Sequence, residues 1–114
     1  MSGRDSDGGF GSGSTGGVVD CADFSFETHI HSPDPQEVAV LSVGTVLSIV
    51  LDELDGIQVV QVRNGARIVG GLVENGPKIR KCLAAGYSFS AIVRSISGAA
   101  VGIFVLPADK VKCP

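Results

Sequence analysis

Aromatic residues are scarce in this sequence. It has no tryptophan and one tyrosine, and aromatic residues make up 5% of its 114 residues. Proteins that bind single-stranded nucleic acid by stacking use aromatic platforms, and only Tyr87 and Phe89 lie near basic residues here. Long apolar runs are absent too, because no stretch approaches the ~18–20 residues that cross a bilayer. We therefore expect no membrane partner.

The motifs of common enzyme classes are also missing. There is no Gly-x-Ser-x-Gly nucleophile elbow, no dinucleotide-binding Gly-x-Gly-x-x-Gly and no phosphate-binding loop. No Cys-x-x-Cys pair is present, which argues against a structural zinc site. We expect a protein that is not an enzyme and that uses no cofactor.

The cysteines are few, widely spaced and odd in number: Cys21, Cys82 and Cys113. Because no basic start followed by an apolar run marks an export signal, we expect reduced thiols and a cytoplasmic location. Cys82 lies in an apolar helical pattern and is predicted to be a small core residue. A bridge between Cys21 and Cys113, near the two ends of the chain, is the alternative.

The chain divides into a tail and one domain. Residues 1–17 hold seven glycines and four serines. Such a segment buries too little apolar surface to offset its ordering entropy, so it is predicted to be a flexible tail. Residues 18–114 are rich in Val, Ile and Leu and predict a single small domain.

The hydrophobic pattern predicts a mainly β (α+β) fold. In chain order, the predicted elements are a strand at 24–31, a helix at 35–42, strands at 46–51, 57–62 and 66–69, a helix between Pro77 and Gly86, and strands at 88–96 and 99–106. Asp55-Gly56 and Asn64-Gly65 are hairpin signals, which make the middle three strands an antiparallel meander. Since both faces of the first two meander strands are apolar, the sheet is covered on both sides or curls up. We expect a small, partly open antiparallel barrel of order β-α-β-β-β-α-β-β.

The charges are segregated along the chain. Residues 1–55 contain ten acidic residues and one basic residue, whereas residues 56–108 contain one acidic and six basic residues. Those six residues are the predicted phosphate-binding face: Arg63, Arg67, Lys78, Arg80, Lys81 and Arg94. Two alternatives remain open. The charges form a solvated surface partly paired with the acids of the first half, or they pair acidic with basic halves in a symmetric dimer.

A candidate metal site lies on the first strand. Glu27, His29 and His31 alternate, so their side chains point to the same side of the strand. One carboxylate and two imidazoles form the ligand set of several zinc and iron sites. Three ligands along one strand are spread over roughly 13–14 Å, so the pattern favours the polar outer face of an edge strand.

A glycine pair marks a point of close approach. Gly70 and Gly71 allow another backbone or a ligand to come near, and the sequence favours a bulge where the third meander strand leaves the sheet. Asn75 to Pro77 then begin a helix whose free N–H groups favour anions.

Several motifs occur in the order found in a known family. Leu41-x-x-Gly44 precedes an apolar strand, Gly65-x-x-Ile68-Val69-Gly70-x-Leu72 follows the next, and a helix with Leu83 and Gly86 leads to a strand that includes Val93. In this order and spacing, residues 41–96 resemble HIRAN-type domains. The resemblance implies an OB- or SH3-like barrel that binds DNA, often at single-stranded ends. The sequence departs from the family in its short first hairpin, Asp52–Gly56, and in Gly71, where an aromatic residue is common.

The segment after the tail has a resemblance of its own. Cys21-Ala22-x-Phe24-x-Phe26-x-Thr28 follows the glycine-rich leader and is similar to a pattern in small bacterial proteins without assigned function. The function expected from the sequence is a non-catalytic binding module whose basic face contacts DNA or another nucleic acid. The alternative is a protein-interaction or homo-oligomerisation domain.

Overall fold

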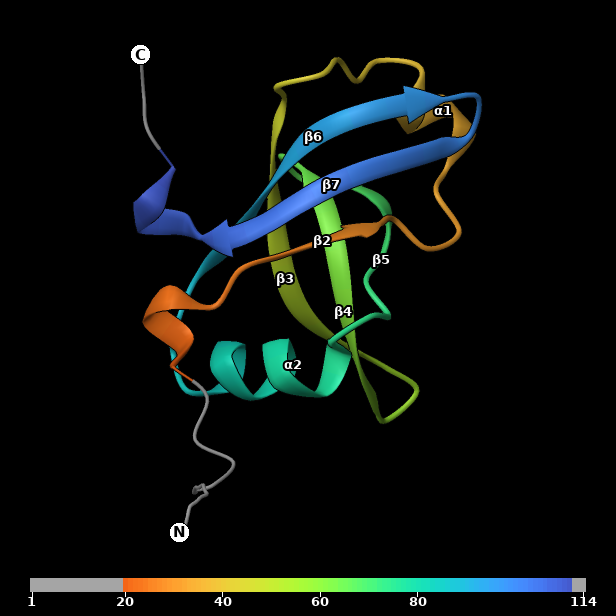
Figure 1. Ribbon diagram of the computed structural model, residues 1–114. Helices are drawn as coiled ribbons and strands as arrows, with labels where there is room; N and C mark the ends of the chain where they lie inside the picture. The colour runs from red at the N-terminus through yellow and green to blue at the C-terminus, as the bar shows by residue number, and fades with distance from the viewer. Residues whose placement is uncertain (1–19, 112–114) are drawn as a thin grey trace, which may run out of the picture.

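The computed structural model describes residues 20–111 and is mainly β, as predicted. Six antiparallel strands form one sheet in the order β2-β7-β6-β3-β4-β5, with helices α1 and α2 placed as expected in the chain (Figure 1). The elements are β2 (Phe26–His29), α1 (Pro35–Val38), β3 (Val46–Leu54), β4 (Ile57–Asn64), β5 (Arg67–Gly71), α2 (Gly76–Ala84), β6 (Phe89–Ser97) and β7 (Ala100–Pro107), with short 3-10 turns at Cys21–Asp23 and Ala108–Lys110. The predicted tail and Cys113 lie outside the described residues.

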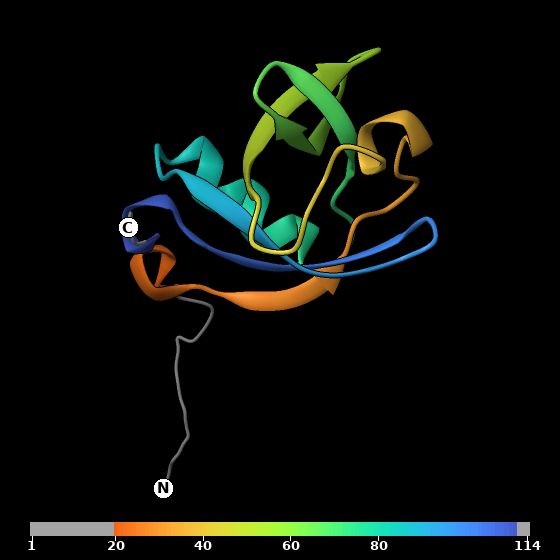
Figure 2. The same ribbon diagram turned by 90° about the horizontal axis from the view of Figure 1, so that it is seen from above.

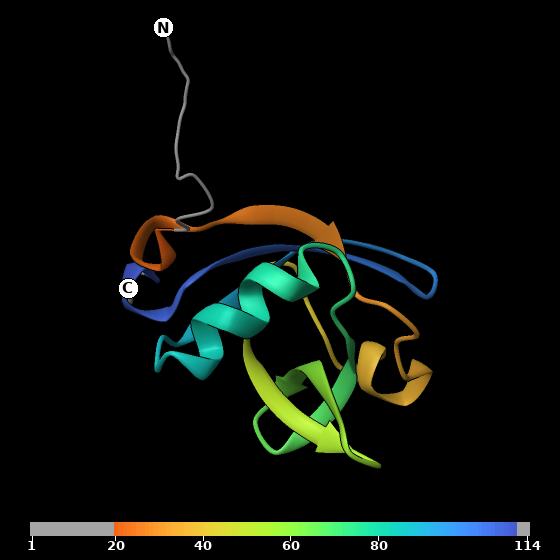
Figure 3. The same ribbon diagram turned by 90° about the horizontal axis from the view of Figure 1, so that it is seen from below.

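The sheet curls until its two edges meet at one point. Beyond the end of β2, His31 pairs with Gly71 of β5, and the two N–H···O distances between their backbones are 2.8 and 2.9 Å. Views from above and below show the strands wrapped around a common centre (Figures 2 and 3). The fold is therefore the partly open barrel expected from the sequence.

Gly70 makes this meeting of edges sterically feasible. A Cβ atom at Gly70 would overlap the side chain of Ile30 and would lie 2.8 Å from the carbonyl oxygen of His31. The prediction of a close backbone approach is confirmed. The expected bulge is present as well: Val62 pairs with Gly70 and Arg63 with Ile68, so Val69, next to Gly70, is the extra residue on β5.

The first hairpin turn of the meander lies where the sequence predicts it, and the second does not. Asp55 and Gly56 both have positive φ, at 53° and 79°, so they are the two central residues of the first turn. In the second hairpin Asn64 pairs with Arg67, which makes Gly65 and Ala66 the central residues. The turn is therefore one residue later than the Asn64-Gly65 signal suggests, because Gly65, with φ of 63°, takes the first central position.

The core fills the inside of the barrel. Val62, Val69 and Val93 are completely buried, and α2 lies across one end of the barrel, where it contributes Ile79 and Cys82 (Figure 3). Within the described residues, no helix covers the outer faces of β3, β4 and β5 in this way. Of the two arrangements left open by the apolar strands, the chain adopts curling rather than coverage on both sides.

The helices begin near the expected residues. The Asp34 carboxylate accepts a hydrogen bond from the Gln36 N–H at 3.0 Å and caps α1, which ends at Val38 and is shorter than predicted. In α2, Pro77 occupies the first turn, and Gly86 follows the helix with a φ of 101°. Neither helix is long and apolar enough to cross a bilayer.

A disulfide corrects the prediction for the cysteines. Cys21 is bonded to Cys82 on α2, with Cα atoms 5.6 Å apart and a sequence separation of 61 residues. The expectation of reduced thiols is wrong for this pair, and so is the alternative bridge from Cys21 to Cys113. Because structural disulfides are typical of oxidising compartments, the cysteines do not support the predicted cytoplasmic location. Cys82 is buried as predicted.

Candidate functional site

The predicted basic face is divided by the fold. Arg63 and Arg67 flank the β4–β5 turn, next to α1, whereas α2 lies toward the opposite end of the barrel (Figure 1). Lys78, Arg80 and Lys81 are on α2. Arg94 is on β6, a third location. The six residues therefore form three groups rather than one stripe.

The two arginines next to α1 are held by acidic partners. Arg63 Nη2 lies 3.1 Å from Asp52 Oδ2 and donates to Gln61 Oε1 at 2.7 Å. Arg67 Nε lies 2.7 Å from Glu37 Oε2. This contact raises the pKa of Arg67 and keeps its guanidinium charged. Both arginines match the predicted pairing of basic residues with acids of the first half.

The Glu37 carboxylate is unusually buried for an acid. Its side chain is 8% exposed, while that of Arg67 is 72% exposed. Oε1 of Glu37 is buried and has no hydrogen-bond partner within residues 20–111. Arg67 therefore neutralises a buried charge of its own chain, and this contact competes with any phosphate for its guanidinium.

The other four residues of the predicted basic face have no acidic partner in the described part of the chain. Within residues 20–111, no carboxylate lies within 4 Å of Lys78, Arg80, Lys81 or Arg94. The Lys78 ammonium lies 6.0 Å from the centre of the Phe24 ring, and the Arg94 guanidinium lies 5.1 Å from that of Phe104. These aromatic contacts orient the side chains without cancelling their charge.

A large hollow adjoins α2. A hollow of about 350 Å³ has mostly aliphatic walls, formed in part by Val59, Leu72, Val73 and Pro77, and Arg80 lies at its helical side. A second hollow, of about 260 Å³, shares His31, Val59, Val60 and Gly71 with the first and extends to Leu54 and Ile68. We refer to the two together as the apolar groove. It crosses the place where β5 ends and the barrel edges meet.

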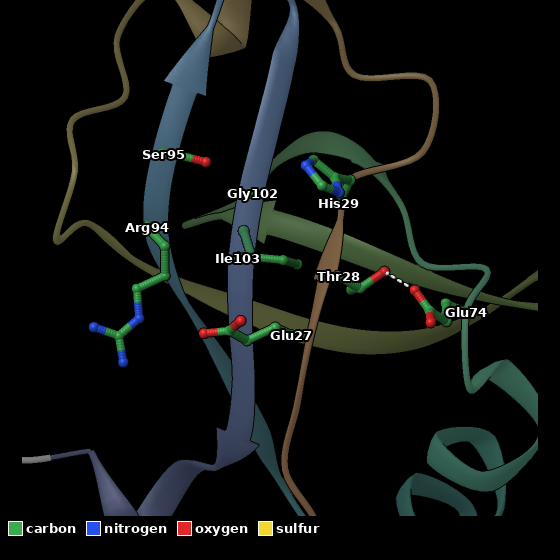
Figure 4. A pocket seen from close by; sticks show the side chains of 8 residues that line it. All are labelled: Glu27, Thr28, His29, Glu74, Arg94, Ser95, Gly102 and Ile103. Carbon is green, nitrogen blue, oxygen red and sulfur yellow. Dashed lines mark hydrogen bonds between the residues drawn. The ribbon is translucent and has the colours of Figure 1, made fainter.

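A polar cavity lies on the outer face of β2, β7 and β6, with a volume of about 250 Å³ (Figure 4). We call it the polar hollow. Its lining consists of Glu27, Thr28, His29, Glu74, Arg94, Ser95, Gly102 and Ile103. Thr28 donates to Glu74 Oε1 at 2.7 Å on the side away from Arg94 (Figure 4). The rest of its polar groups face solvent.

The histidines of the candidate metal site are separated. Glu27 and His29 line the polar hollow, whereas His31 lines the apolar groove. No cluster of three His, Cys, Asp or Glu side chains suited to a metal ion occurs among residues 20–111. All three residues are exposed, but the structure does not bring their side chains together at one site.

Two features of these sites can hardly be predicted from the sequence. Ser95 faces outward beside Arg94 because a register shift between Val93 and Ser95 interrupts the alternation of β6. The groove combines Leu54, Ile68 and Val73 from three separate segments. The exposed aliphatic residues are visible in the sequence, but their neighbours are set only by the closing of the barrel.

Comparisons with known proteins identify no relative: no family model, no curated protein and no solved structure matches this chain.

Proposed function

We propose that this domain is a non-catalytic binding module for a nucleic-acid strand, which lies along α2 and enters the apolar groove. The proposal depends on the position of Arg80 in the wall of the apolar groove, on a helix whose cationic residues have no acidic partner among residues 20–111. Phosphates would contact Lys78, Arg80 and Lys81. Sugars and bases would pack against the aliphatic wall.

The charge distribution supports this arrangement over the six-residue face. Arg63 and Arg67 are occupied by Asp52 and Glu37, so they add little to phosphate binding. The net charge of the chain is −3, which weakens the attraction of a polyanion. Affinity is therefore modest and falls steeply with salt, because each neutralised phosphate releases counterions.

The resemblance of residues 41–96 to HIRAN-type domains supports the same proposal. That resemblance implies a small barrel that binds DNA. The described lining of the groove contains no Phe, Tyr or Trp, so stacking contributes little, and the preference between bases is weak.

The test is an NMR titration of the full chain with a short single-stranded oligonucleotide and a matched duplex, at low and high salt. We expect amide shifts at α2 and the groove that disappear at high salt. Arg80→Gln should weaken binding several-fold and reduce the salt slope by about one phosphate contact. Arg94→Gln is the control, since it removes the same charge from a distant strand.

Two results contradict the proposal. One is equal loss of binding in Arg80→Gln and Arg94→Gln, which would show a general charge effect. The other is the absence of shifts at α2 with either oligonucleotide at high micromolar concentration.

A protein partner is the second candidate. Leu54, Ile57 and Ile68 lie on the outer face of β3, β4 and β5 and are 53%, 66% and 48% exposed. Clustered apolar residues of this kind mark interaction surfaces. If this face joins two copies of the chain, light scattering will show a mass that rises with concentration, and Ile57→Lys will abolish the rise. A constant monomer mass contradicts self-association.

A further inference from the structure

The polar hollow contains two facing pairs of side chains. The register of β2, β7 and β6 places His29, Gly102 and Ser95 in one row across the three strands, and Glu27 and Phe104 in the next row. In Figure 4 the Ser95 hydroxyl and the His29 ring face each other across Gly102, while Glu27 and Arg94 lie on the two sides of β7. Each pair leaves a gap between its polar groups.

Gly102 lies between Ser95 and His29, and because it has no side chain it leaves space between them. The position that a Cβ atom would occupy there lies 2.5 Å from Ser95 Oγ and 3.7 Å from His29 Nε2. A polar ligand atom just above this point is within hydrogen-bonding reach of both side chains. The interruption of β6 after Val93 is what directs Ser95 to this face, and such bulges commonly redirect a side chain next to a binding site.

The second gap combines opposite charges. Neither Glu27 nor Arg94 forms an ion pair within 4 Å with any of residues 20–111, and the Arg94 guanidinium lies 5.1 Å from the ring centre of Phe104. A group that lies between them must donate to the carboxylate and accept from the guanidinium. A hydroxyl group does both, whereas a phosphate only accepts and would be repelled by Glu27.

We propose that the polar hollow binds a neutral sugar ring, with one hydroxyl between His29 and Ser95 and another between Glu27 and Arg94. The two rows are about 7 Å apart, twice the rise per residue of a strand, a span that hydroxyls on opposite sides of a sugar ring reach. The volume of about 250 Å³ accommodates one such ring. This site is separate from the apolar groove and does not depend on the proposed nucleic-acid function.

The experiment is an NMR titration of the full chain with D-glucose, D-ribose and uridine, each up to tens of millimolar. We expect saturable shifts at the amides of residues 27–29, 94–95 and 102–104, with millimolar dissociation constants, because small ligands gain little free energy per atom. A preference for ribose and uridine assigns the site to a nucleoside sugar. A preference for glucose assigns it to a free hexose.

Variants separate binding from folding. Ser95→Ala and His29→Ala should each weaken binding ~5-fold, the effect of losing one hydrogen bond, while the spectrum outside the hollow stays unchanged. Ser97→Ala, at an exposed position of the same strand, is the matched control and should bind as the wild type does. The double variant Ser95→Ala/Gly102→Ala fills the space at Gly102 without the clash and should abolish binding.

Three outcomes overturn the proposal. The first is the absence of saturable shifts with all three sugars. The second is a set of shifts that Ser95→Ala leaves as strong as in the wild type. The third is a response of the hollow to sodium phosphate but not to sugars, which would assign the site to an anion.

Discussion

The polar hollow and the apolar groove are lined in part by residues of the same short segment, yet the two sites form in different ways. Glu27 and His29 line the hollow, and His31, two residues on, lines the groove. On the hollow side, Glu27 and His29 are exposed as the alternation of the first strand predicts, whereas Ser95 is turned outward by the register shift in β6. The groove lies where pairing ends and separate segments meet. Sequence alternation thus predicts part of the hollow, and no local pattern predicts the groove.

The largest expected effect comes from releasing the disulfide, which ties the segment before β2 to α2 and so to the groove. Cys21→Ala/Cys82→Ala should lower the free energy of unfolding by about 2–4 kcal/mol, because the unfolded chain regains the freedom of a long closed loop. Urea denaturation of the wild type with and without reductant, and of the variant, measures this change. If reduction leaves the midpoint unchanged, the bridge does not stabilise the fold.

The second prediction breaks the groove and spares the hollow. Gly70→Ala should cost about 1–3 kcal/mol, since the new methyl group meets backbone at His31 and the buried Ile30 side chain. Gly71→Ala is the matched control, because its Cβ atom has only ordinary contacts at 3.8 and 3.9 Å. Thermal unfolding should separate the two variants, and amide shifts in Gly70→Ala should concentrate at the groove. Equal stability of both variants would contradict the account of the barrel closure.

The third prediction alters the hollow and spares the groove. In Gly102→Ala the new Cβ atom meets only the Ser95 hydroxyl at 2.5 Å, which can rotate away. Alanine also restricts the unfolded chain more than glycine does, so we expect a net change within about 1 kcal/mol. Chemical denaturation compared with Gly70→Ala is the measurement. A loss larger than that of Gly70→Ala would show that the outer face is packed as tightly as the barrel edges.

The smallest effect concerns an exposed contact away from both regions. Lys110 Nζ lies 3.2 Å from Asp23 Oδ1, and this hydrogen bond, with one involving Asp20, lowers the pKa of Asp23. A lowered pKa in the folded state stabilises the fold above the ordinary pKa of aspartate, and this contribution disappears as the pH falls through the lowered value. Asp23→Asn should therefore be slightly less stable than the wild type at neutral pH and equal to it near pH 2. A constant difference across this range would contradict the assignment.

Much of the architecture was predictable because it depends on local signals. The alternation of apolar and polar residues predicts β2, Asp55-Gly56 predicts the first hairpin, and the capping residue Asp34 predicts where α1 begins. The predicted position of the second turn is one residue too early, because Asn64-Gly65 is compatible with two turn positions. Only the pairing of Asn64 with Arg67 distinguishes them. The outward turn of Ser95 was not predictable, since a bulge depends on the partner strand.

The candidate sites were less predictable than the fold. The six basic residues lie close together in the chain, but the fold divides them into three groups. Glu37 and Arg67 are 30 residues apart, and no local pattern predicts their contact. The disulfide was missed for a similar reason. Cys21 precedes the first strand and Cys82 lies on α2, and their distance depends on how the barrel places its ends.

The sequence by itself determined the strand and helix order and the exposure of Glu27, His29 and His31, because these follow from side-chain periodicity and local turn chemistry. Only the tertiary structure decided which charges are free, where the groove opens and which cysteines join. These depend on distances between residues far apart in the chain, which are fixed when the barrel edges meet at His31 and Gly71.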